Sequence, residues 1–315
     1  MEQERNKASV RRRLHHVCTA TVGATLALVM AGGLVTNTGS ALAVPDWPTT
    51  FGYNMFTYPP SQWVGGVLYE HTHRLLGSLV GLLTIALLAA AWFWEERSWV
   101  RWLTFVALIA VIAQGVLGGM RVVLLRHDLA MVHGSFAQAF FGLLVVLWVV
   151  TAPSWDRLGE SSATLQGSRL AGSLALVLPA AVYTQIVLGA FLTHRGQALW
   201  EHVAGAALVA GLVVVALAWV MRASPETAAL RTPVFALAGL VALQLSLGFL
   251  AYLWHFTNLH LRLPYQVGLM VLAAHRMTGT LVWGTSLVFA LRLARALFRS
   301  EGAGWSVKEA SKAWT

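Results

Sequence analysis

Eight apolar runs, each of about 20 residues, constrain this chain more than any other feature of its sequence. A helix of that length spans the ~30 Å hydrocarbon core of a bilayer. With 57% hydrophobic and 11% charged residues, the chain has too little polar surface to cover a soluble globule. The sequence therefore predicts an all-α integral membrane protein with eight transmembrane helices. The runs lie near residues 17–37, 73–94, 102–122, 130–152, 170–193, 202–221, 233–254 and 269–291.

The basic residues predict the orientation of these helices. Of the 22 Lys and Arg residues, 16 fall in the two tails and in the three connections on the same side as the tails. Cytoplasmic segments collect Lys and Arg, so both termini are expected in the cytoplasm. Topology also accounts for the net charge of +9, and we expect no nucleic-acid partner.

The first apolar run, after Arg11–Arg13 and before Ala41–Ala43, imitates a secretory leader. We expect it to be retained, because residues 36–42 match residues 193–199 at the end of the fifth run. A leader destined for removal has no reason to resemble a helix in the body of the protein.

A repeat runs through the whole chain. A Gln-x-x-x-Gly pattern recurs at 114–118, 185–189 and 244–248, and His133 and His275 each precede a glycine by nine positions. Such repeats predict two duplicated four-helix bundles, related by a pseudo-twofold axis along the membrane normal. The predicted segments are a cytoplasmic basic tail (1–16), a first bundle (17–152) with an outer loop (38–72), a cytoplasmic linker (153–169), a second bundle (170–298) and a cytoplasmic tail (299–315).

Four histidines lie about one turn inside the outer ends of predicted helices, two in each bundle. Ionisable side chains inside a membrane bundle usually have a function, and imidazoles that face each other across helices can hold haem iron. Under the repeat, His73 corresponds to His202 and His133 to His275, so each bundle is expected to hold one facing pair, His73 with His133 and His202 with His275. The other histidines fall in the N-terminal tail or near outer loops and are expected to be solvated, with His71 singled out for its place beside His73. They are His15, His16, His71, His127, His194, His255 and His260.

Charged residues next to these histidines suggest further roles. Arg74 and Arg276 directly follow two of them and suit the carboxylates of haem propionates. Glu70 stands three residues before His73, where it could move protons, cap the helix or pair with Arg74. Its counterpart Glu201 is adjacent to its histidine instead, so we expect one catalytic and one supporting site.

Two segments together carry a family resemblance: GSALAVPDWP at 39–48 and EHTHR at 70–74. They resemble the haem A synthase family, which oxidises the C8 methyl of haem O to a formyl group for terminal oxidases. The resemblance implies that His73 and His133 are the substrate-haem ligands, that His202 and His275 hold a haem b cofactor, and that Glu70 is the functional glutamate. It also implies a bacterial cytoplasmic (inner) membrane, with lipid, haem O, haem O synthase and oxidase assembly factors as candidate partners. The resemblance does not decide whether the protein forms a homo-oligomer.

The chain departs from the family in its cysteines. Many members carry a cysteine pair in the first outer loop, but Val44 stands at the motif position and Cys18 is the only cysteine, which excludes an intramolecular disulfide. Two alternatives remain from sequence: a dihaem b-type electron carrier that works with quinones, and a non-catalytic haem chaperone for oxidase assembly. We interpret the long outer loop of the first half as a lid over an exchangeable haem, with interfacial packing of its aromatic residues as the alternative.

Overall fold

The computed structural model describes residues 2–155, 168–222, 228–258 and 262–312, and these residues confirm the predicted all-α membrane class. Each of the eight α-helices found there contains a stretch long and apolar enough to cross a membrane. A short 3-10 helix, η1 (Pro60–Gln62), lies in the first outer connection. The α-helices are α1 (Glu2–Asn37), α2 (Gly66–Trp94), α3 (Ser98–Val123), α4 (His127–Thr151), α5 (Arg169–Arg195), α6 (Leu199–Arg222), α7 (Ala228–Phe256) and α8 (Tyr265–Lys312).

Several helices extend well beyond the apolar runs that predicted them. Helix α1 begins at Glu2, and α8 continues to Lys312, so residues 16 and 299 lie within helices rather than at helix ends. Hydropathy marks the part of a helix that lies in lipid, whereas the helix itself continues until a breaking residue or a turn ends it. Helix α2 begins at Gly66, which places Glu70 and His73 on one helix, a turn apart.

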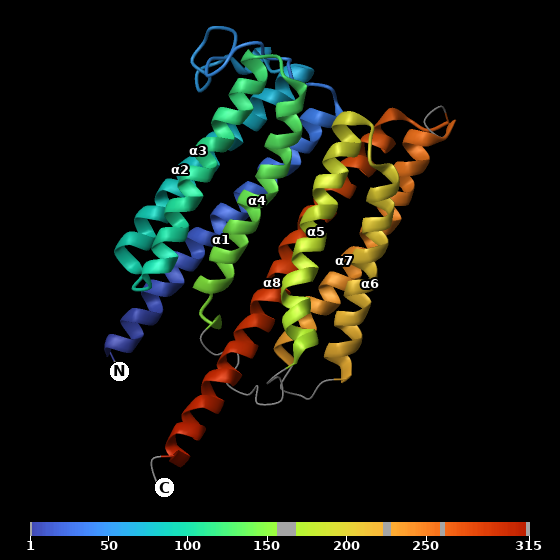
Figure 1. Ribbon diagram of the computed structural model, residues 1–315. Helices are drawn as coiled ribbons and strands as arrows, with labels where there is room; N and C mark the ends of the chain where they lie inside the picture. The colour runs from blue at the N-terminus through green and yellow to red at the C-terminus, as the bar shows by residue number, and fades with distance from the viewer. Residues whose placement is uncertain (1, 156–167, 223–227, 259–261, 313–315) are drawn as a thin grey trace.

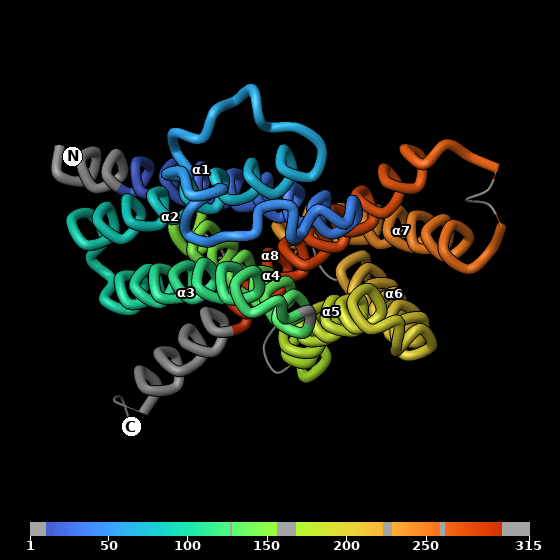
Figure 2. The backbone as a smooth tube through the Cα atoms, turned by 90° about the horizontal axis from the view of Figure 1, so that it is seen from above, coloured from blue at the N-terminus to red at the C-terminus, as the bar shows by residue number. Residues whose placement is uncertain are grey.

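The helices form two neighbouring sets of four, α1–α4 and α5–α8 (Figures 1 and 2). Within each set, sequential helices pack against each other and the first helix also packs against the fourth. The sets meet through α1, α4, α5 and α8. Helix α1 begins and α8 ends at the same end of the molecule (Figure 1). This grouping agrees with two bundles, while their origin by duplication stays a prediction.

The crossing of α4 and α8 explains one part of the sequence repeat. The indole of Trp283 lies against Gly142, where an added Cβ would come within 2.7 Å of the ring, and Phe141 lies in the same way against Gly284. Trp283 also donates its indole N–H to the backbone oxygen of Gln138 at 2.8 Å. The glycines nine residues after His133 and His275 therefore allow the two helices to pack closely.

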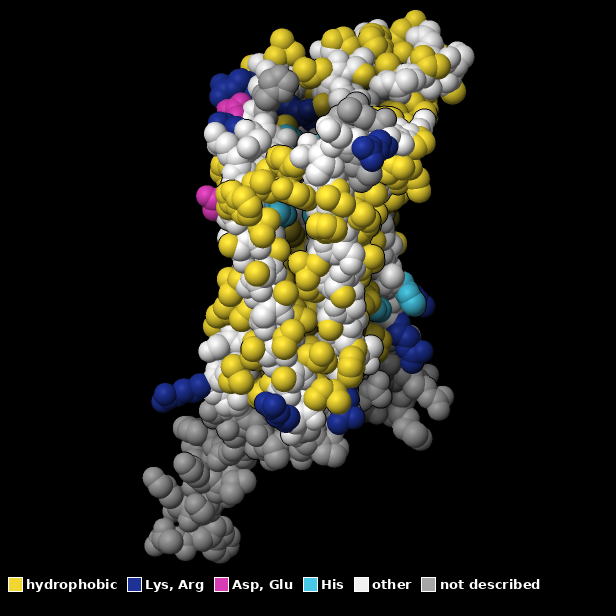
Figure 3. All heavy atoms as spheres, turned by 90° about the vertical axis from the view of Figure 1, so that its right-hand side faces the viewer, with side chains coloured by type: hydrophobic (Ala, Val, Ile, Leu, Met, Phe, Trp, Pro, Cys, Tyr) yellow, Lys and Arg dark blue, Asp and Glu magenta, His cyan; other side chains and the backbone are white. Residues whose placement is uncertain are grey.

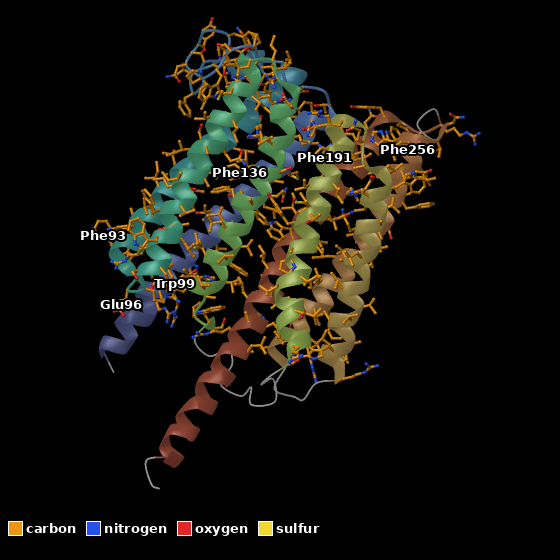
Figure 4. The ribbon with its side chains drawn as sticks, viewed as in Figure 1. Phe93, Glu96, Trp99, Phe136, Phe191 and Phe256 are labelled. Atoms are coloured by element: carbon orange, nitrogen blue, oxygen red, sulfur yellow. The ribbon has the colours of Figure 1, made fainter. Side chains whose placement is uncertain are left out.

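The outer surface of the bundles is apolar along the middle of the face in Figure 3, with Lys and Arg near its two ends. Exposed aromatic residues cluster where α2 ends and α3 begins, and Phe93 there is 83% exposed (Figure 4). Glu95 is buried beside them and pairs with Arg97 at 2.8 Å. Burial opposes ionisation of Glu95, but hydrogen bonds from Arg97 outweigh it and lower the pKa of this carboxyl. These features suit a lipid-facing surface with an aromatic interface.

The two halves differ most in their first outer connections. Helices α5 and α6 are joined by residues 196–198 only, because Gly196 adopts a left-handed conformation (φ 64°) that ends α5 abruptly. Helices α1 and α2 are joined by residues 38–65, called the outer loop below. Figure 2 shows this loop lying over the α1–α4 set.

Candidate functional site

The four helix-end histidines form two pairs with nearly the same geometry. The ring centres of His73 on α2 and His133 on α4 are 6.4 Å apart, with an interplanar angle of 79°. Those of His202 on α6 and His275 on α8 are also 6.4 Å apart, with an angle of 69°. The structure thus brings together the two histidines predicted to face each other in each set of helices.

This spacing suits a metal held between two imidazoles. Two metal–nitrogen bonds of about 2 Å, with roughly 1 Å from each nitrogen to its ring centre, span about 6 Å. The residues that the structure describes contain no cluster of three or more His, Cys, Asp or Glu for a metal held by protein alone. Two axial imidazoles per site are what haem needs, because the porphyrin supplies the other four ligands. The residues present therefore fit haem iron.

Each histidine ring lies against a glycine of the preceding odd-numbered helix. A Cβ added at any of these glycines would come within 3.0–3.2 Å of the Cε1 atom of the ring. A side chain at these positions would crowd the ring, so glycine lets the ring pack this close to a helix backbone. The four glycines are Gly32 beside His73, Gly118 beside His133, Gly189 beside His202 and Gly248 beside His275.

The glutamines of the Gln-x-x-x-Gly repeat reach the same histidines. The amide nitrogen of Gln114 donates to the backbone oxygen of His133 at 3.1 Å. That of Gln185 lies 2.8 Å from the backbone oxygen and 3.1 Å from Nδ1 of His202, and that of Gln244 lies 3.2 Å from Nε2 of His275. Sequence reasoning noticed this repeat without linking it to the histidines, although its equal spacing in three helices was the available signal.

Glu70 and Arg74 fasten the outer loop to the start of α2. Their side chains form a buried ion pair at 2.8 Å, and the other carboxylate oxygen of Glu70 accepts the backbone N–H of Val44 at 3.0 Å. Arg74 donates to the backbone oxygens of Val44, Asp46 and Thr49. All four Nη hydrogens of Arg74 are used in these bonds, so only its Nε–H remains. The pairing alternative for Glu70 is therefore observed, and its side chain does not cap α2, whose N-cap is Gly65.

Trp47 and Asp46 fix the loop at a second place. The indole of Trp47 packs against Gly119 of α3, the residue after the glycine that touches His133. The carboxylate of Asp46 accepts hydrogen bonds from Thr49 and from the backbone N–H groups of Phe51 and Gly52. Burial opposes ionisation of Asp46, but these hydrogen bonds outweigh it and lower its pKa. The loop is thus anchored next to both histidines of the first pair.

The expectation that His71 is solvated was wrong. Its side chain is fully buried beneath the outer loop, where Nδ1 lies 3.3 Å from the hydroxyl of Thr50 and the ring packs against Tyr58 and Trp63. The loop folds back over α2, and the sequence pattern did not predict this contact between distant segments. Of the other loop histidines, His260 and the side chain of His127 lie outside the described residues.

Several charged residues near the pairs take different positions. Arg276 donates to the backbone oxygen of Gly33 at 3.3 Å, so it reaches from α8 to α1. Arg121 of α3 interacts electrostatically with Glu70, His73 and His133, and its guanidinium forms no hydrogen bond within the described part of the chain. Glu70 is 4% exposed whereas Glu201 is exposed, so these two carboxylates lie in different surroundings.

Comparison with known proteins gives a consistent family. The family model for cytochrome oxidase assembly proteins (COX15-CtaA) matches residues 15–204, which include His73, His133 and His202. A protein named Heme A synthase from Shouchella clausii is 36% identical over 127 residues, covering 39% of this chain and 40% of that protein. One of the same name from Exiguobacterium sibiricum is 30% identical and covers 54% and 55%.

These two alignments span only about half of the relatives' length. A more distant Heme A synthase, from Geobacillus kaustophilus, is 25% identical over 303 residues, covering 92% of this chain and 88% of that protein. The similarity therefore extends across both sets of helices, at lower identity.

Proposed function

Since this chain belongs to the family of cytochrome oxidase assembly proteins, we propose that it is a haem A synthase that oxidises the C8 methyl of haem O to a formyl group. Relatives that carry this name match up to 92% of the chain. The product, haem A, would serve the biogenesis of terminal oxidases, and the bilayer of a bacterium would be its place of action.

The observation that carries this proposal is the position of the outer loop. It is anchored by Arg74, which follows His73, and by Trp47 on Gly119, which lies next to the glycine that contacts His133. The second pair has only residues 196–198 between α5 and α6. A loop that covers one of two otherwise similar pairs suits one exchangeable substrate and one resident cofactor better than two fixed cofactors.

His73 and His133 would hold the iron of haem O, and His202 and His275 that of a haem b cofactor. Bound haem would supply the redox chemistry, as cofactors do, while the chain binds and orients it. The Glu70–Arg74 pair would keep the loop closed and water out of the first site. Of the carboxylates on α2, Glu70 would be the one closest to His73 in sequence, where it would move a proton.

The haem propionates require cations on the outer side. Arg276 lies beside the second pair and near α1, and Arg74 retains its Nε–H for a carboxylate. We add Arg121 to these two, because it interacts electrostatically with both histidines of the first pair and its guanidinium has no hydrogen-bond partner in the described part of the chain.

We also propose that both termini face the cytoplasm. The distribution of Lys and Arg supports this orientation. The native Cys18 is buried and should not react with a thiol reagent. A cysteine introduced at Ser61 should therefore react with an impermeant reagent from outside the cell, and one at Ser162 should not. The opposite labelling pattern would invert the topology.

The activity is tested by expressing the chain with a haem O synthase in cells that lack haem A, followed by chromatography of the extracted haems. Haem A that appears with the chain, and not with its His73→Ala variant, supports the proposal. Bound haem without haem A would favour the dihaem electron carrier or the haem chaperone instead. Reduction of the bound haem by a quinol would then separate these two alternatives.

A further inference from the structure

The contact between α1 and α8 carries a cation that no carboxylate of the described chain neutralises. The largely buried guanidinium of Arg276 reaches from α8 to α1, where it donates to the backbone oxygen of Gly33 at 3.3 Å. Among the described residues, no aspartate or glutamate forms an ion pair with Arg276. A charged side chain inside a membrane bundle needs a partner, because lipid and apolar side chains do not solvate it. The contact therefore suits an anionic ligand.

Asn37 adds a second donor to the same contact. Its amide nitrogen, Nδ2, is buried and has no hydrogen-bond partner within the described chain. Asn37 lies one turn beyond Gly33 on the same face of α1. In an α-helix, the backbone oxygen of Gly33 is also the acceptor for the backbone N–H of Asn37. The guanidinium of Arg276 thus binds the turn of α1 to which Asn37 belongs.

Tyr265, at the start of α8, shows that this turn of α1 faces α8. Its hydroxyl donates to the backbone oxygen of Asn37 at 3.1 Å. Tyr265 and Arg276 are ~16 Å apart along α8, whereas Gly33 and Asn37 are only ~6 Å apart along α1. The two side chains of α8 therefore extend toward each other and converge on one turn of α1, close to the start of the outer loop.

The sequence repeat does not reproduce these donors at the equivalent contact. Helices α4 and α5 form that contact between the two sets. In the repeat, Asn37 corresponds to His194 of α5, and Arg276 corresponds to Gly134 of α4. An arginine and an asparagine therefore meet in this way only between α1 and α8. A donor pair that occurs once favours a specific ligand over general packing of the two sets.

We propose that Arg276 and Asn37 bind a carboxylate, namely a propionate of the haem held by His202 and His275. Arg276 directly follows His275, which keeps its side chain near the second pair. Guanidinium and amide donors suit a carboxylate, whose two oxygens accept several hydrogen bonds. The proposal rests on the proposed function. It gives α1, a helix of the first set, a part in the haem site of the second.

The test measures haem loss from the full-length protein in detergent, loaded with haem b and mixed with excess apomyoglobin. A His73→Ala background reports on the second pair. Asn37→Ala should speed haem loss roughly tenfold, the usual size of one hydrogen bond to a charged group. Asn37→Asp should speed it further, because the new carboxylate competes with the propionate for Arg276. If Asn37 only joined the two helices, an aspartate that pairs with Arg276 would retain haem as well as the parent.

Two controls separate propionate binding from helix packing. Tyr265→Phe removes a neighbouring hydrogen bond between α1 and α8 and should leave haem loss unchanged. Haem b dimethyl ester lacks the free carboxylates, so Asn37→Ala should not change the rate at which the ester is lost. Parent rates of haem b loss in both Asn37 variants, or an equal effect on the ester, would overturn the proposal.

A His275→Ala background reports on the first pair and identifies the source of the carboxylate. The Asn37 variants should leave haem loss from the first pair unchanged, and faster loss there alone would overturn the assignment to the second. Haem loss needs no conversion of haem O, so this measurement can fail independently of the proposed activity. A His73→Ala protein that binds no haem would count against the second pair as a haem site, and hence against both proposals.

Discussion

Replacing Glu70 with glutamine removes one charge from a buried ion pair and changes little else. The side chain keeps its size, and one oxygen can still accept the backbone N–H of Val44. Arg74 keeps its three bonds to loop backbone oxygens but loses its only carboxylate partner in the described structure. The substitution therefore tests how strongly this pair holds the outer loop.

The magnitude follows from the burial of the pair. The side chains of Arg74 and Glu70 are 9% and 6% exposed, so the remaining charge cannot be solvated by water in the closed state. Removing one partner of a buried ion pair lowers the stability by about 3–5 kcal/mol. Because Arg74 keeps its contacts with the loop backbone, we place the cost of the substitution near the lower end of this range, about 3 kcal/mol. This free energy corresponds to roughly a hundredfold more frequent opening of the outer loop.

Hydrogen exchange followed by mass spectrometry measures this opening. Peptides that cover residues 44–58 should exchange roughly a hundredfold faster in Glu70→Gln than in the parent protein. Glu95→Gln is the matched control, because Glu95 is also buried and paired with an arginine at 2.8 Å, but at the other end of α2 from the outer loop. It should leave exchange in the outer loop unchanged.

The same variant separates two roles of Glu70. We expect haem to remain bound while haem A formation falls strongly. Unchanged loop exchange with lost haem A formation would refute the loop argument and favour a direct role in proton transfer. Normal haem A formation despite a loosened loop would show that neither role matters for activity.

Three further substitutions test the site. His275→Ala should remove one low-spin b-type haem from the purified protein, because a single imidazole cannot maintain bis-histidine ligation; an unchanged haem content and optical spectrum would contradict the second pair. Gly119→Ala should displace Trp47, whose ring lies 2.2 Å from the added Cβ, and expose the loop to protease, whereas Gly115→Ala has no atom within 4 Å and should match the parent. The lowered pKa of Asp46 means that its contribution to the loop is complete above about pH 4 and is lost as the pH falls through that pKa. Protease sensitivity should rise only in strong acid, and Asp46→Asn should be sensitive at neutral pH; a parent loop that opens well above pH 4 would refute this.

Local properties of the sequence were sufficient for the membrane class and for much of the site. Hydropathy over about 20 residues identified eight spans, because insertion into lipid depends on each segment's own composition. The repeat related His73 to His202 and His133 to His275, so it predicted the same histidine pair in each bundle, and both pairs are found. Duplication itself, the ligand roles and the orientation stay predictions.

Contacts between distant segments were decided by tertiary structure alone. Three contacts depend on how residues 38–65 fold over the helices. His71 is buried, Arg74 donates hydrogen bonds to three loop backbone oxygens, and Trp47 packs against Gly119. Periodicity shows which face of a helix is apolar, but it does not show which loop atoms will cover that face. For the same reason, the Gln-x-x-x-Gly repeat was visible in sequence, while its contact with the histidines required the packing of each odd-numbered helix against the next.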